Sequence, residues 1–575
     1  MSYETIANHL EALYGAETAQ ALLPRIEELG RRHSMPDSLR APRGPSLALD
    51  QEDALLITYG DQVRASGQSP LRTLGEFCAA RLKGVLSGIH ILPFYPFTSD
   101  DGFSVVDYRA VDPALGTWQE VESLGHGFDL MFDAVFNHIS SESAWFQGFL
   151  KGDPVYRDYV VVVEGDPDLS AVIRPRALPL LTTFTTAGGE RRVWTTFSPD
   201  QVDVNVRHPE VLLELLDVLL EYVAKGARFI RLDAIAFLWK EPGTTCLHLP
   251  QTHRIIRLMR ALLDEVAPQV VIVTETNVPH ADNISYFGDG RNEAQLVYNF
   301  ALPPLVLHAL LTGDGSVLTR WAQGLKRPSE SVTYLNFLAS HDGIGLNPAR
   351  GILPEAEIQE VLVGAAMAHG GFVSYKNNPD SSQSPYELNI NFFDALSDPF
   401  GTSEPVDIQV RRFLVAQSIM LSLAGMPGIY FHSLFGSRGD RVGAERTGIP
   451  RRINRQKLTR EELDRDLGDP HSLRAKVFGG FQKLLSARRS HAAFHPAGGQ
   501  VVLDAGSGIF AVAREARDGG ERMLCLHNLT GNAVRAALPE AEAHRWGEEV
   551  SSLGGGRGAA DELGPYEVRW LRATS

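Results

Sequence analysis

Short apolar runs rich in β-branched residues recur through the middle of the chain, and amphipathic segments separate most of them. Buried parallel strands give such runs, whereas apolar residues every three or four positions indicate a helix, as at 209–225 and 252–266. The predicted strands are 54–59, 90–94, 130–136, 229–234, 270–276, 295–300, 333–340 and 428–431. Eight strands that alternate with helices predict an α/β fold, a (β/α)8 TIM barrel.

The remaining segments divide the chain into three predicted parts. Residues 1–45 have leucines at helical spacing and predict an N-terminal helical segment, which a stretch with proline and glycine ends. Residues 46–495 hold the catalytic barrel, with insertions at about 140–205 and 343–405 that are too long for simple βα connections. Over 496–575, short alternating runs between glycine-rich turns predict a C-terminal antiparallel β domain.

Composition narrows the classes of partner. A net charge of -16 over 575 residues argues against a nucleic-acid partner, although a local basic pocket for an anionic substrate is compatible with it. The three cysteines do not suggest a disulfide framework and suit a reducing cytoplasm. We find no secretion signal and no membrane-spanning apolar run. We therefore expect a cytoplasmic monomer or homodimer that acts on small molecules.

Three predicted strands lead into a carboxylate, namely Asp233, Glu275 and Asp342. A buried carboxylate is costly without a partner or a function, and the carboxyl ends of barrel strands are where active sites lie. A retaining glycosidase needs one carboxylate as nucleophile and a second carboxyl group as acid and base. Arg231 lies two residues before Asp233, so it points to the same side of the strand and can keep Asp233 ionised.

Other polar residues near these strand ends have simpler interpretations. His138 and His341 are natural donors to sugar hydroxyls, whereas Asp133 suits a structural role. A single strand-end acid is more often a cap or an ion-pair partner, but the whole set in this order favours catalysis. We find no phosphate-binding Gly-Lys-Ser/Thr loop and no His/Cys metal cluster, so we expect no cofactor and no metal. Calcium stays open, because oxygen ligands leave little signature in a sequence.

Four motifs together resemble the α-amylase superfamily of retaining glycosidases. They are Asp133-Ala-Val-Phe-Asn-His138, Arg231-Leu-Asp-Ala234, Thr274-Glu-Thr276 and Ser340-His-Asp342. The resemblance implies a nucleophile at Asp233, a general acid and base at Glu275 and a transition-state stabiliser at Asp342.

More particular stretches are similar to the sucrose phosphorylase group, whose members transfer a glucosyl unit reversibly between an α-glucoside and inorganic phosphate. These stretches are 57–62, 174–176, 196–203, 240–246, 300–305 and 452–455. The resemblance implies a substrate site in which Asp61 and Arg455 anchor the donor glucose. The other residues that it implies are Phe197 and Gln201 along the wall, Arg176 and Tyr386 on the acceptor and phosphate side, and Tyr108.

Two positions depart from the sucrose phosphorylase pattern. Asn277 replaces a histidine that helps to bind phosphate, and Ser384 replaces an aspartate that contacts fructose. Loss of this acidic group removes repulsion against an anionic acceptor. The surrounding segments resemble the glucosylglycerate phosphorylases, which implies D-glycerate as the acceptor. Arg176, Lys376, Asn377 and Asn277 are candidates to bind its carboxylate, although Lys376 and Asn377 also suit an ordinary turn.

The resulting hypothesis is a retaining glycoside phosphorylase. Asp233 forms a β-glucosyl-enzyme while Glu275 protonates the leaving oxygen, and phosphate as co-substrate then gives α-glucose 1-phosphate. The segment 343–405 is the expected gate against water. The alternatives are a sucrose phosphorylase, a phosphorylase for glycerol or fructose 6-phosphate, a hydrolase or transglucosidase, and a silent carbohydrate-binding protein.

Overall fold

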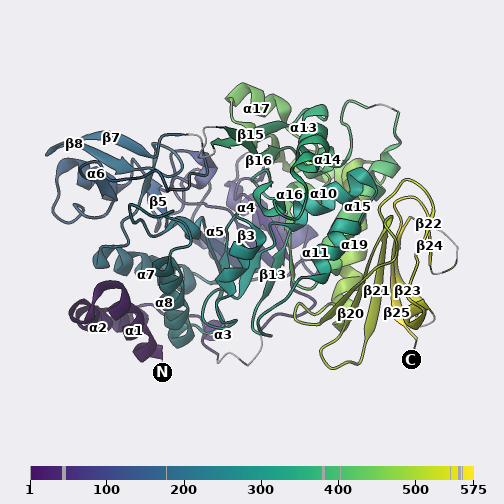
Figure 1. Ribbon diagram of the computed structural model, residues 1–575, viewed down its shortest axis with the longest axis horizontal. Helices are drawn as coiled ribbons and strands as arrows, with labels where there is room; N and C mark the ends of the chain where they lie inside the picture. The colour runs from purple at the N-terminus through teal and green to yellow at the C-terminus, as the bar shows by residue number, and fades with distance from the viewer. Residues whose placement is uncertain are drawn as a thin grey trace.

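The computed structural model describes residues 2–41, 44, 47–176, 178–377, 382–401, 403–543, 546–554, 559 and 561–574 (Figure 1). The predicted boundary between the N-terminal segment and the barrel, at residues 45 and 46, lies outside the described residues. Among the described helices, none combines the length and the apolarity that crossing a membrane requires.

Eight parallel strands form a closed barrel, hydrogen-bonded in the order β1, β17, β13, β12, β11, β10, β4 and β3. They are β1 (Leu55–Thr58), β3 (Gly88–Ile91), β4 (Asp129–Ala134), β10 (Ala227–Leu232), β11 (Val271–Thr274), β12 (Leu296–Tyr298), β13 (Thr333–Asn336) and β17 (Met426–Tyr430). Each overlaps one predicted strand, so the TIM barrel is confirmed. One prediction was wrong in detail: β13 ends at Asn336, so Asp342 lies on the following loop rather than at a strand end.

Helices surround the barrel. They include α4 (Pro70–Arg81), α5 (Trp118–Leu124), α7 (Pro209–Ala224), α8 (Pro250–Val266), α10 (Leu302–Thr312), α11 (Ser316–Gln323), α15 (Val406–Ser422) and α19 (Leu473–Ser490). The helices predicted at 209–225 and 252–266 correspond to α7 and α8. These two helices flank β10 in the chain, and α7 packs against the strand that leads to Asp233.

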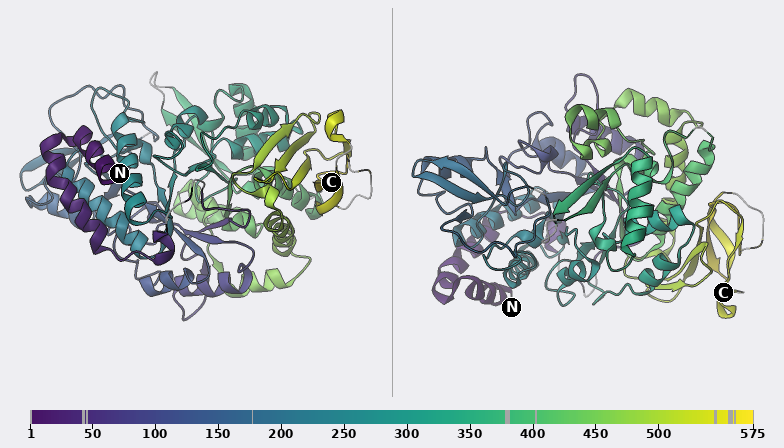
Figure 2. Two further views of the ribbon diagram at one scale, coloured as in Figure 1. Left: turned by 90° about the horizontal axis from the view of Figure 1, so that it is seen from below. Right: turned by 45° about the horizontal axis from the view of Figure 1, so that its top comes forward.

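Three helices precede the barrel: α1 (Ser2–Tyr14), α2 (Ala16–Arg32) and the short α3 (Asp37–Arg40). Figures 1 and 2 show α1 and α2 beside α7 and α8. The Tyr14 hydroxyl donates to the Val206 carbonyl at 2.6 Å, and His33 Nε2 lies 2.7 Å from Asp217 on α7. The N-terminal helices therefore support the outer layer of the barrel on the side of β10.

Two insertions rise from the carboxyl ends of the strands. The first contains β5 (His138–Ser140), α6 (Ala144–Lys151), β6 (Val162–Val163), β7 (Leu181–Thr186), β8 (Gly189–Trp194) and β9 (Gln201–Asp203). The second contains a three-stranded sheet of β14 (Ile344–Gly345), β16 (Gln383–Asn389) and β15 (Phe372–Asn377), in that spatial order. Both lie at the upper side of Figure 1, over the end of the barrel where active sites form.

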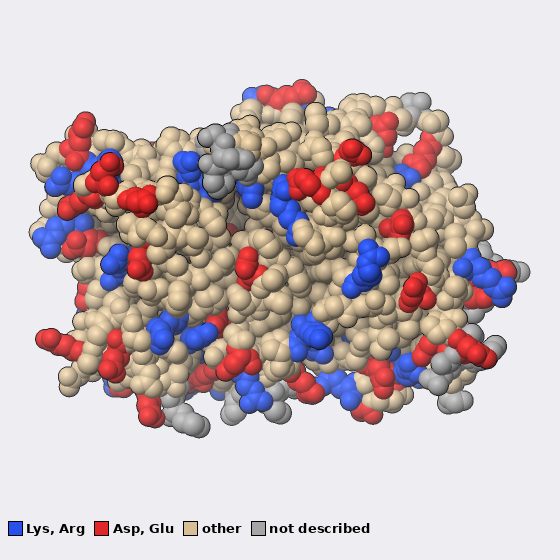
Figure 3. Space-filling view, viewed as in Figure 1, with Lys and Arg blue, Asp and Glu red and all other residues tan. Residues whose placement is uncertain are grey.

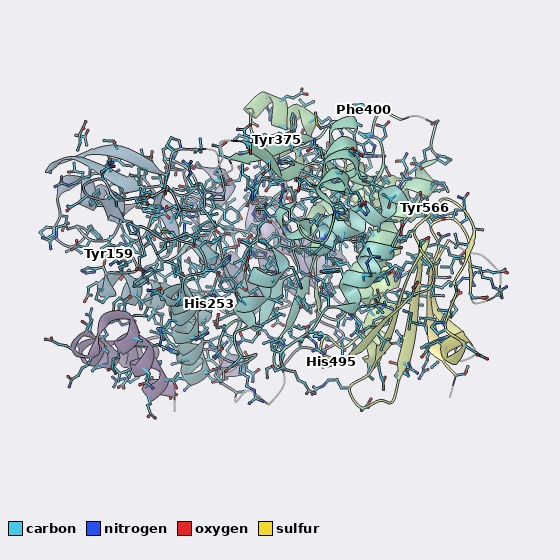
Figure 4. The ribbon with its side chains drawn as sticks, in the orientation of Figure 1. Tyr159, His253, Tyr375, Phe400, His495 and Tyr566 are labelled. Atoms are coloured by element: carbon cyan, nitrogen blue, oxygen red, sulfur yellow. The ribbon has the colours of Figure 1, made fainter. Side chains whose placement is uncertain are left out.

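A five-stranded antiparallel sheet lies near the C-terminus, at the opposite end of the molecule from α1 and α2 (Figures 1 and 2). Its order is β19 (Gly499–Leu503), β20 (Ile509–Glu515), β21 (Arg522–Asn528), β25 (Val568–Ala573) and β23 (Trp546–Leu553). The predicted antiparallel β domain is thus confirmed. Where the sheet packs against the barrel, buried Arg514 donates to the carbonyls of Gly499, Ser422 and His495. The bond to Ser422 attaches the sheet to the segment before β17. His495 is labelled in this region in Figure 4.

Candidate active site

A cavity of about 330 Å³ lies at the carboxyl end of the barrel, between the two insertions. Figure 3 shows a hollow on the viewed face between these insertions, with acidic and basic side chains interspersed around it. The predicted residues that line the cavity are Asp233, Glu275, Asp342, His138, Arg176, Phe197, Gln201, Asn277, His341, Lys376 and Tyr386. Residues from the segments that follow β4, β10, β11 and β13, which include both insertions, thus meet in one place.

The register of two neighbouring strands places the first two acids. Leu232 of β10 lies opposite Thr274 of β11, so the next residue on each strand, Asp233 and Glu275, leaves the sheet at the same level. Ala234 then adopts a left-handed conformation with φ of 47°, which is uncommon for a residue with a side chain. Its backbone N–H donates to Glu275 Oε2 at 3.0 Å. The turn after β10 therefore also orients the acid on β11.

The positive charge of Arg231 lies beside Asp233 and Glu275 and offsets part of their negative charge. Its Nη1 donates to Asp233 Oδ1 at 2.7 Å and also to Asp133 Oδ1. Its Nη2 is 3.8 Å from Glu275 Oε2. Asp133 is completely buried and contacts His90 Nε2 at 2.7 Å, away from the cavity wall. Asp133 thus lies where it can hold Arg231, as the structural interpretation of this residue requires.

Burial and nearby negative charge raise the pKa values of both Asp233 and Glu275. Two interacting carboxyl groups of this kind share a proton and titrate as a pair. Arg231 contacts Asp233 directly but is 3.8 Å from Glu275, so its positive charge favours ionisation of Asp233 over ionisation of Glu275. This is the charge distribution that a nucleophile and a general acid need before the first step.

Asp342 is held as an anion by a different arginine. Arg451 Nη1 lies 2.7 Å from Asp342 Oδ1, and its other side makes two contacts with Glu387, at 2.7 and 3.0 Å. Burial alone would raise the pKa of Asp342, but the Arg451 guanidinium holds it well below its usual range. Asp342 is therefore a permanent negative charge beside the other two acids, suited to stabilise positive charge on a sugar ring.

Aromatic side chains form part of the cavity wall. The rings of Phe103 and His341 are stacked at 4.7 Å with planes 5° apart, and Phe197 lies 5.1 Å from the His138 ring. Gln201 Nε2 lies 3.2 Å from His138 Nε2. Burial lowers the pKa of His138 to about 4 and that of His341 to about 3, so both imidazoles are neutral near pH 7. Both ring nitrogens of His138 are engaged, Nε2 with the Phe103 carbonyl at 2.8 Å and Nδ1 with the Asn137 side chain at 3.2 Å. His341 Nδ1 has no hydrogen-bond partner among the described residues and is the nitrogen available to a sugar hydroxyl.

Neither of the two predicted glucose anchors is among the residues that line the cavity. The two oxygens of Asp61 contact Lys457 and Arg64, each at 2.6 Å. Arg455 pairs with Asp101 at 2.7 Å, and its Nε donates to the His341 carbonyl. Asp101 belongs to the short helix Asp100–Gly102, where it has a φ of 50°, and was not predicted from the sequence. The contacts of Asp61 and Arg455 with glucose stay predictions.

Two further predicted substrate contacts are not on the cavity wall. The Tyr108 hydroxyl is buried and donates to the carbonyls of Val135 and His138, so this side chain supports the wall from behind. Asn377 lies at the end of β15, where its Oδ1 accepts a hydrogen bond from Gln383 at 3.0 Å. Conversely, several lining residues were not predicted: Asp100, Phe103, Asn347, Arg350, Glu387 and Arg451.

A buried lysine connects the first insertion to the barrel. Lys240 Nζ lies 2.6 Å from both Asp203 Oδ2 and Asn137 Oδ1. Asp203 in turn accepts hydrogen bonds from the backbone N–H and the hydroxyl of Thr196, at 2.8 and 2.6 Å. Thr196 precedes Phe197, so this ion pair sets the position of an aromatic residue on the cavity wall.

We expect Lys240→Met to destabilise the fold by about 3–5 kcal/mol, because it leaves the buried Asp203 carboxylate without a cation. Urea unfolding measures this loss. The matched control is Lys225→Met, which removes a half-exposed contact with Glu122 and should cost less than about 1 kcal/mol. Equal losses in the two variants would contradict the role given to Lys240.

The protonation of Glu275 predicts a pH dependence. Burial and the Asp342 charge raise the pKa of Glu275, so donor cleavage should fall as pH rises through this elevated pKa. In Asp342→Asn one raising influence is gone, so the basic limb of kcat/KM should move to lower pH, in addition to a large loss of rate. The measurement is a pH profile of both enzymes with the same donor. A basic limb that stays in place or moves upward would contradict the assignment of the acid.

Within the described residues, no group of three or more His, Cys, Asp or Glu side chains is arranged to hold a metal ion. The three cysteines Cys78, Cys246 and Cys525 are free and buried.

The closed parallel barrel and its converging acids define the class of this protein as a catalytic barrel of the α-amylase type. The family model described as the alpha amylase catalytic domain matches residues 83–342. Among solved structures, the sucrose 6F-phosphate phosphorylase of Thermoanaerobacter thermosaccharolyticum is similar, with a TM-score of 0.72 and 25% identity. That alignment covers 84% of this chain and 95% of the other.

Sequence comparison gives the particular family. The chain is 51% identical to a glucosylglycerate phosphorylase of Allomeiothermus silvanus, over 99% of this chain and 98% of the relative. It is 30% identical to a sucrose phosphorylase of Agrobacterium vitis, over 79% of this chain and 91% of that protein. The chain belongs to the family of the glucosylglycerate phosphorylases.

Proposed function

We propose that this protein catalyses the reversible phosphorolysis of 2-O-α-D-glucosyl-D-glycerate to α-D-glucose 1-phosphate and D-glycerate. The observation that supports the proposal most directly is that the acids and two cations of the cavity lining come from different parts of the fold. Asp233 and Glu275 line the cavity directly after β10 and β11, and Asp342 lines it from the loop after β13, whereas Arg350 and Lys376 line it from the second insertion. A neutral glucosyl unit suits the three acids, and an anionic acceptor suits the two cations, whose side of the cavity is the proposed acceptor end.

The proposed reaction has two steps with inversion in each. Asp233 attacks the anomeric carbon while Glu275 gives its proton to the departing oxygen of glycerate, and a β-glucosyl-enzyme forms. Arg231 and Asp342 stabilise the charges on either side of the sugar. Phosphate, itself a good anionic nucleophile, then attacks the same face that glycerate left, which restores the α configuration.

Phosphate must compete with water for the glucosyl-enzyme. Arg176 is the cation best placed to bind it from the first insertion, since it lines the cavity and pairs with Asp100 at 2.7 Å. Its guanidinium also lies over the Phe197 ring, 5.6 Å from the centroid. The sheet of β14, β15 and β16 covers the other side of the cavity and supplies the proposed gate.

The identity of the relatives favours D-glycerate over fructose, because the glucosylglycerate phosphorylase match is longer and closer than the sucrose phosphorylase match. We propose that the reaction needs no cofactor, with phosphate as co-substrate, and that it takes place in the cytoplasm. The enzyme class that follows is a hexosyltransferase of the phosphorylase type.

The direct test is incubation of the purified protein with glucosylglycerate, with and without inorganic phosphate. We expect α-glucose 1-phosphate and D-glycerate in equal amounts, only when phosphate is present, as followed by nuclear magnetic resonance. Free glucose formed at the same rate without phosphate would identify a hydrolase instead. Absence of turnover in both conditions would overturn the proposal.

A further inference from the structure

The acceptor end of the cavity contains a cation that the sequence did not predict. Arg350 follows the short helix Asn347–Ala349 and lines the cavity. One guanidinium nitrogen pairs with Glu355, and Nη2 donates to the Pro385 carbonyl at 3.0 Å. These two contacts fix the orientation of the group. Its Nε is buried and has no hydrogen-bond partner among the described residues, so one donor is available to a ligand.

Lys376 lies close enough to Arg350 for their charges to interact. Burial and the positive charge of Arg350 lower the pKa of Lys376 from its ordinary value, and the Glu355 carboxylate that pairs with Arg350 offsets part of this effect. Within the described residues, no carboxylate forms a salt bridge with Lys376. Tyr375, the residue before it, is labelled on this hairpin near the top of Figure 4. Two cations that repel each other at a cavity wall are a site that an anion would stabilise.

The residue opposite Lys376 in the sheet does not neutralise the positive charge of its ammonium group. In the β15–β16 pair, Lys376 lies directly opposite Ser384. Side chains opposite each other in an antiparallel pair are neighbours on one face of the sheet. A serine contributes no charge there, whereas an acidic side chain would pair with Lys376 and neutralise it.

Two buried amide oxygens lie on the same wall. Asn277 Oδ1 and Asn347 Oδ1 are both buried without a hydrogen-bond partner among the described residues. Gly345 packs directly against Asn277, and a Cβ at Gly345 would lie 2.6 Å from Asn277 Oδ1. Only a glycine allows this approach, so the position of the amide is fixed by the backbone. These oxygens are acceptors for hydroxyl groups of a ligand.

From these contacts we infer that Arg350 and Lys376 form the carboxylate-binding site of the acceptor and select a small hydroxycarboxylate over a neutral polyol. This inference rests on the proposed function. Arg350 offers the oriented donor and Lys376 the second positive charge, while the two asparagines accept hydrogen bonds from hydroxyls that do not react. Arg350 is thus a specificity-determining residue of the reaction.

The test compares D-glycerate with glycerol, which lacks the carboxylate, as acceptors from α-glucose 1-phosphate. In Arg350→Gln, the ratio of kcat/KM for D-glycerate to kcat/KM for glycerol should fall about 10- to 100-fold, the effect of losing a charge-assisted hydrogen bond. Arg320→Gln, an exposed position on α11 outside the cavity, is the matched control and should keep the wild-type ratio. An unchanged ratio in Arg350→Gln overturns the inference.

A second variant keeps the test informative if Arg350→Gln does not fold. Ser384→Asp places a carboxylate opposite Lys376 and should lower the same ratio without removing any contact of Arg350. The phosphate KM of phosphorolysis is measured in parallel, and a rise in that KM with an unchanged acceptor ratio would assign Arg350 to phosphate and contradict the inference. If wild-type protein does not use D-glycerate at all, the proposed function fails rather than the assignment of Arg350.

Discussion

Glu275→Gln is expected to slow the use of glucosylglycerate far more than the use of α-glucose 1-phosphate. Glycerate leaves through an alkoxide oxygen that needs a proton, and Glu275 is the assigned proton donor because Arg231 contacts Asp233 and favours ionisation of that partner. General acid catalysis of this kind contributes about 10²–10⁴-fold. Phosphate leaves as a stable anion with a second pKa of about 6, so it needs much less help.

The measurement is kcat/KM of one variant with both donors, so that each donor is the control for the other. We expect a loss of about 10³-fold for glucosylglycerate and a loss below about 10-fold for glucosyl transfer from α-glucose 1-phosphate. Equal losses with both donors would show that Glu275 is not the proton donor to the departing oxygen.

Asp233→Asn should abolish turnover with both donors. The side chain supplies the covalent bond to the sugar, so no choice of leaving group can compensate, and we expect a loss of about 10⁵-fold or more. The matched control is Asp282→Asn, which changes an exposed acid on the rim of the same cavity and should retain most activity. Residual activity within about 10²-fold of wild type in Asp233→Asn would contradict the nucleophile assignment.

A chemical rescue separates the nucleophile from a structural role. In Asp233→Gly with α-glucose 1-phosphate, azide has room to attack the anomeric carbon from the side that the carboxylate occupied, while phosphate leaves. A single displacement inverts the configuration, so the expected product is β-glucosyl azide. Rescue without this product, or formation of the α-azide, would contradict the assignment.

The barrel was predictable because its strands are buried on both faces and therefore apolar throughout. β23 (Trp546–Leu553) lacks this signal. It is the edge strand of the C-terminal sheet, and its glycine, glutamate and serine residues give no apolar run. Edge strands of this kind are protected by polar side chains, which hide them from a search for hydrophobic alternation.

The residues of the candidate site also differ in how readily the sequence predicts them. Asp233 and Glu275 directly follow strands, so the sequence pattern located them, and Arg231 follows from the alternation of side chains along β10. Asp101 and Arg451 lie in short 3-10 helices, Asp100–Gly102 and Pro450–Asn454, and Arg350 follows a third, Asn347–Ala349. These one-turn helices belong to the connections between strands, whose paths depend on tertiary contacts. Asp61 lies three residues after the end of β1, where its oxygens contact Lys457 and Arg64. Position directly after a strand therefore located Asp233 and Glu275, but not Asp342, which lies on the loop after β13.

Phosphate release from α-glucose 1-phosphate, measured with D-glycerate, glycerol, fructose, fructose 6-phosphate or water as acceptor, decides both the reaction type and the acceptor. We expect rapid release that depends on D-glycerate, with much slower release for the neutral acceptors and for water. Release that depends on fructose and not on D-glycerate would contradict the proposed acceptor. Equal release with water alone would contradict a phosphorylase altogether.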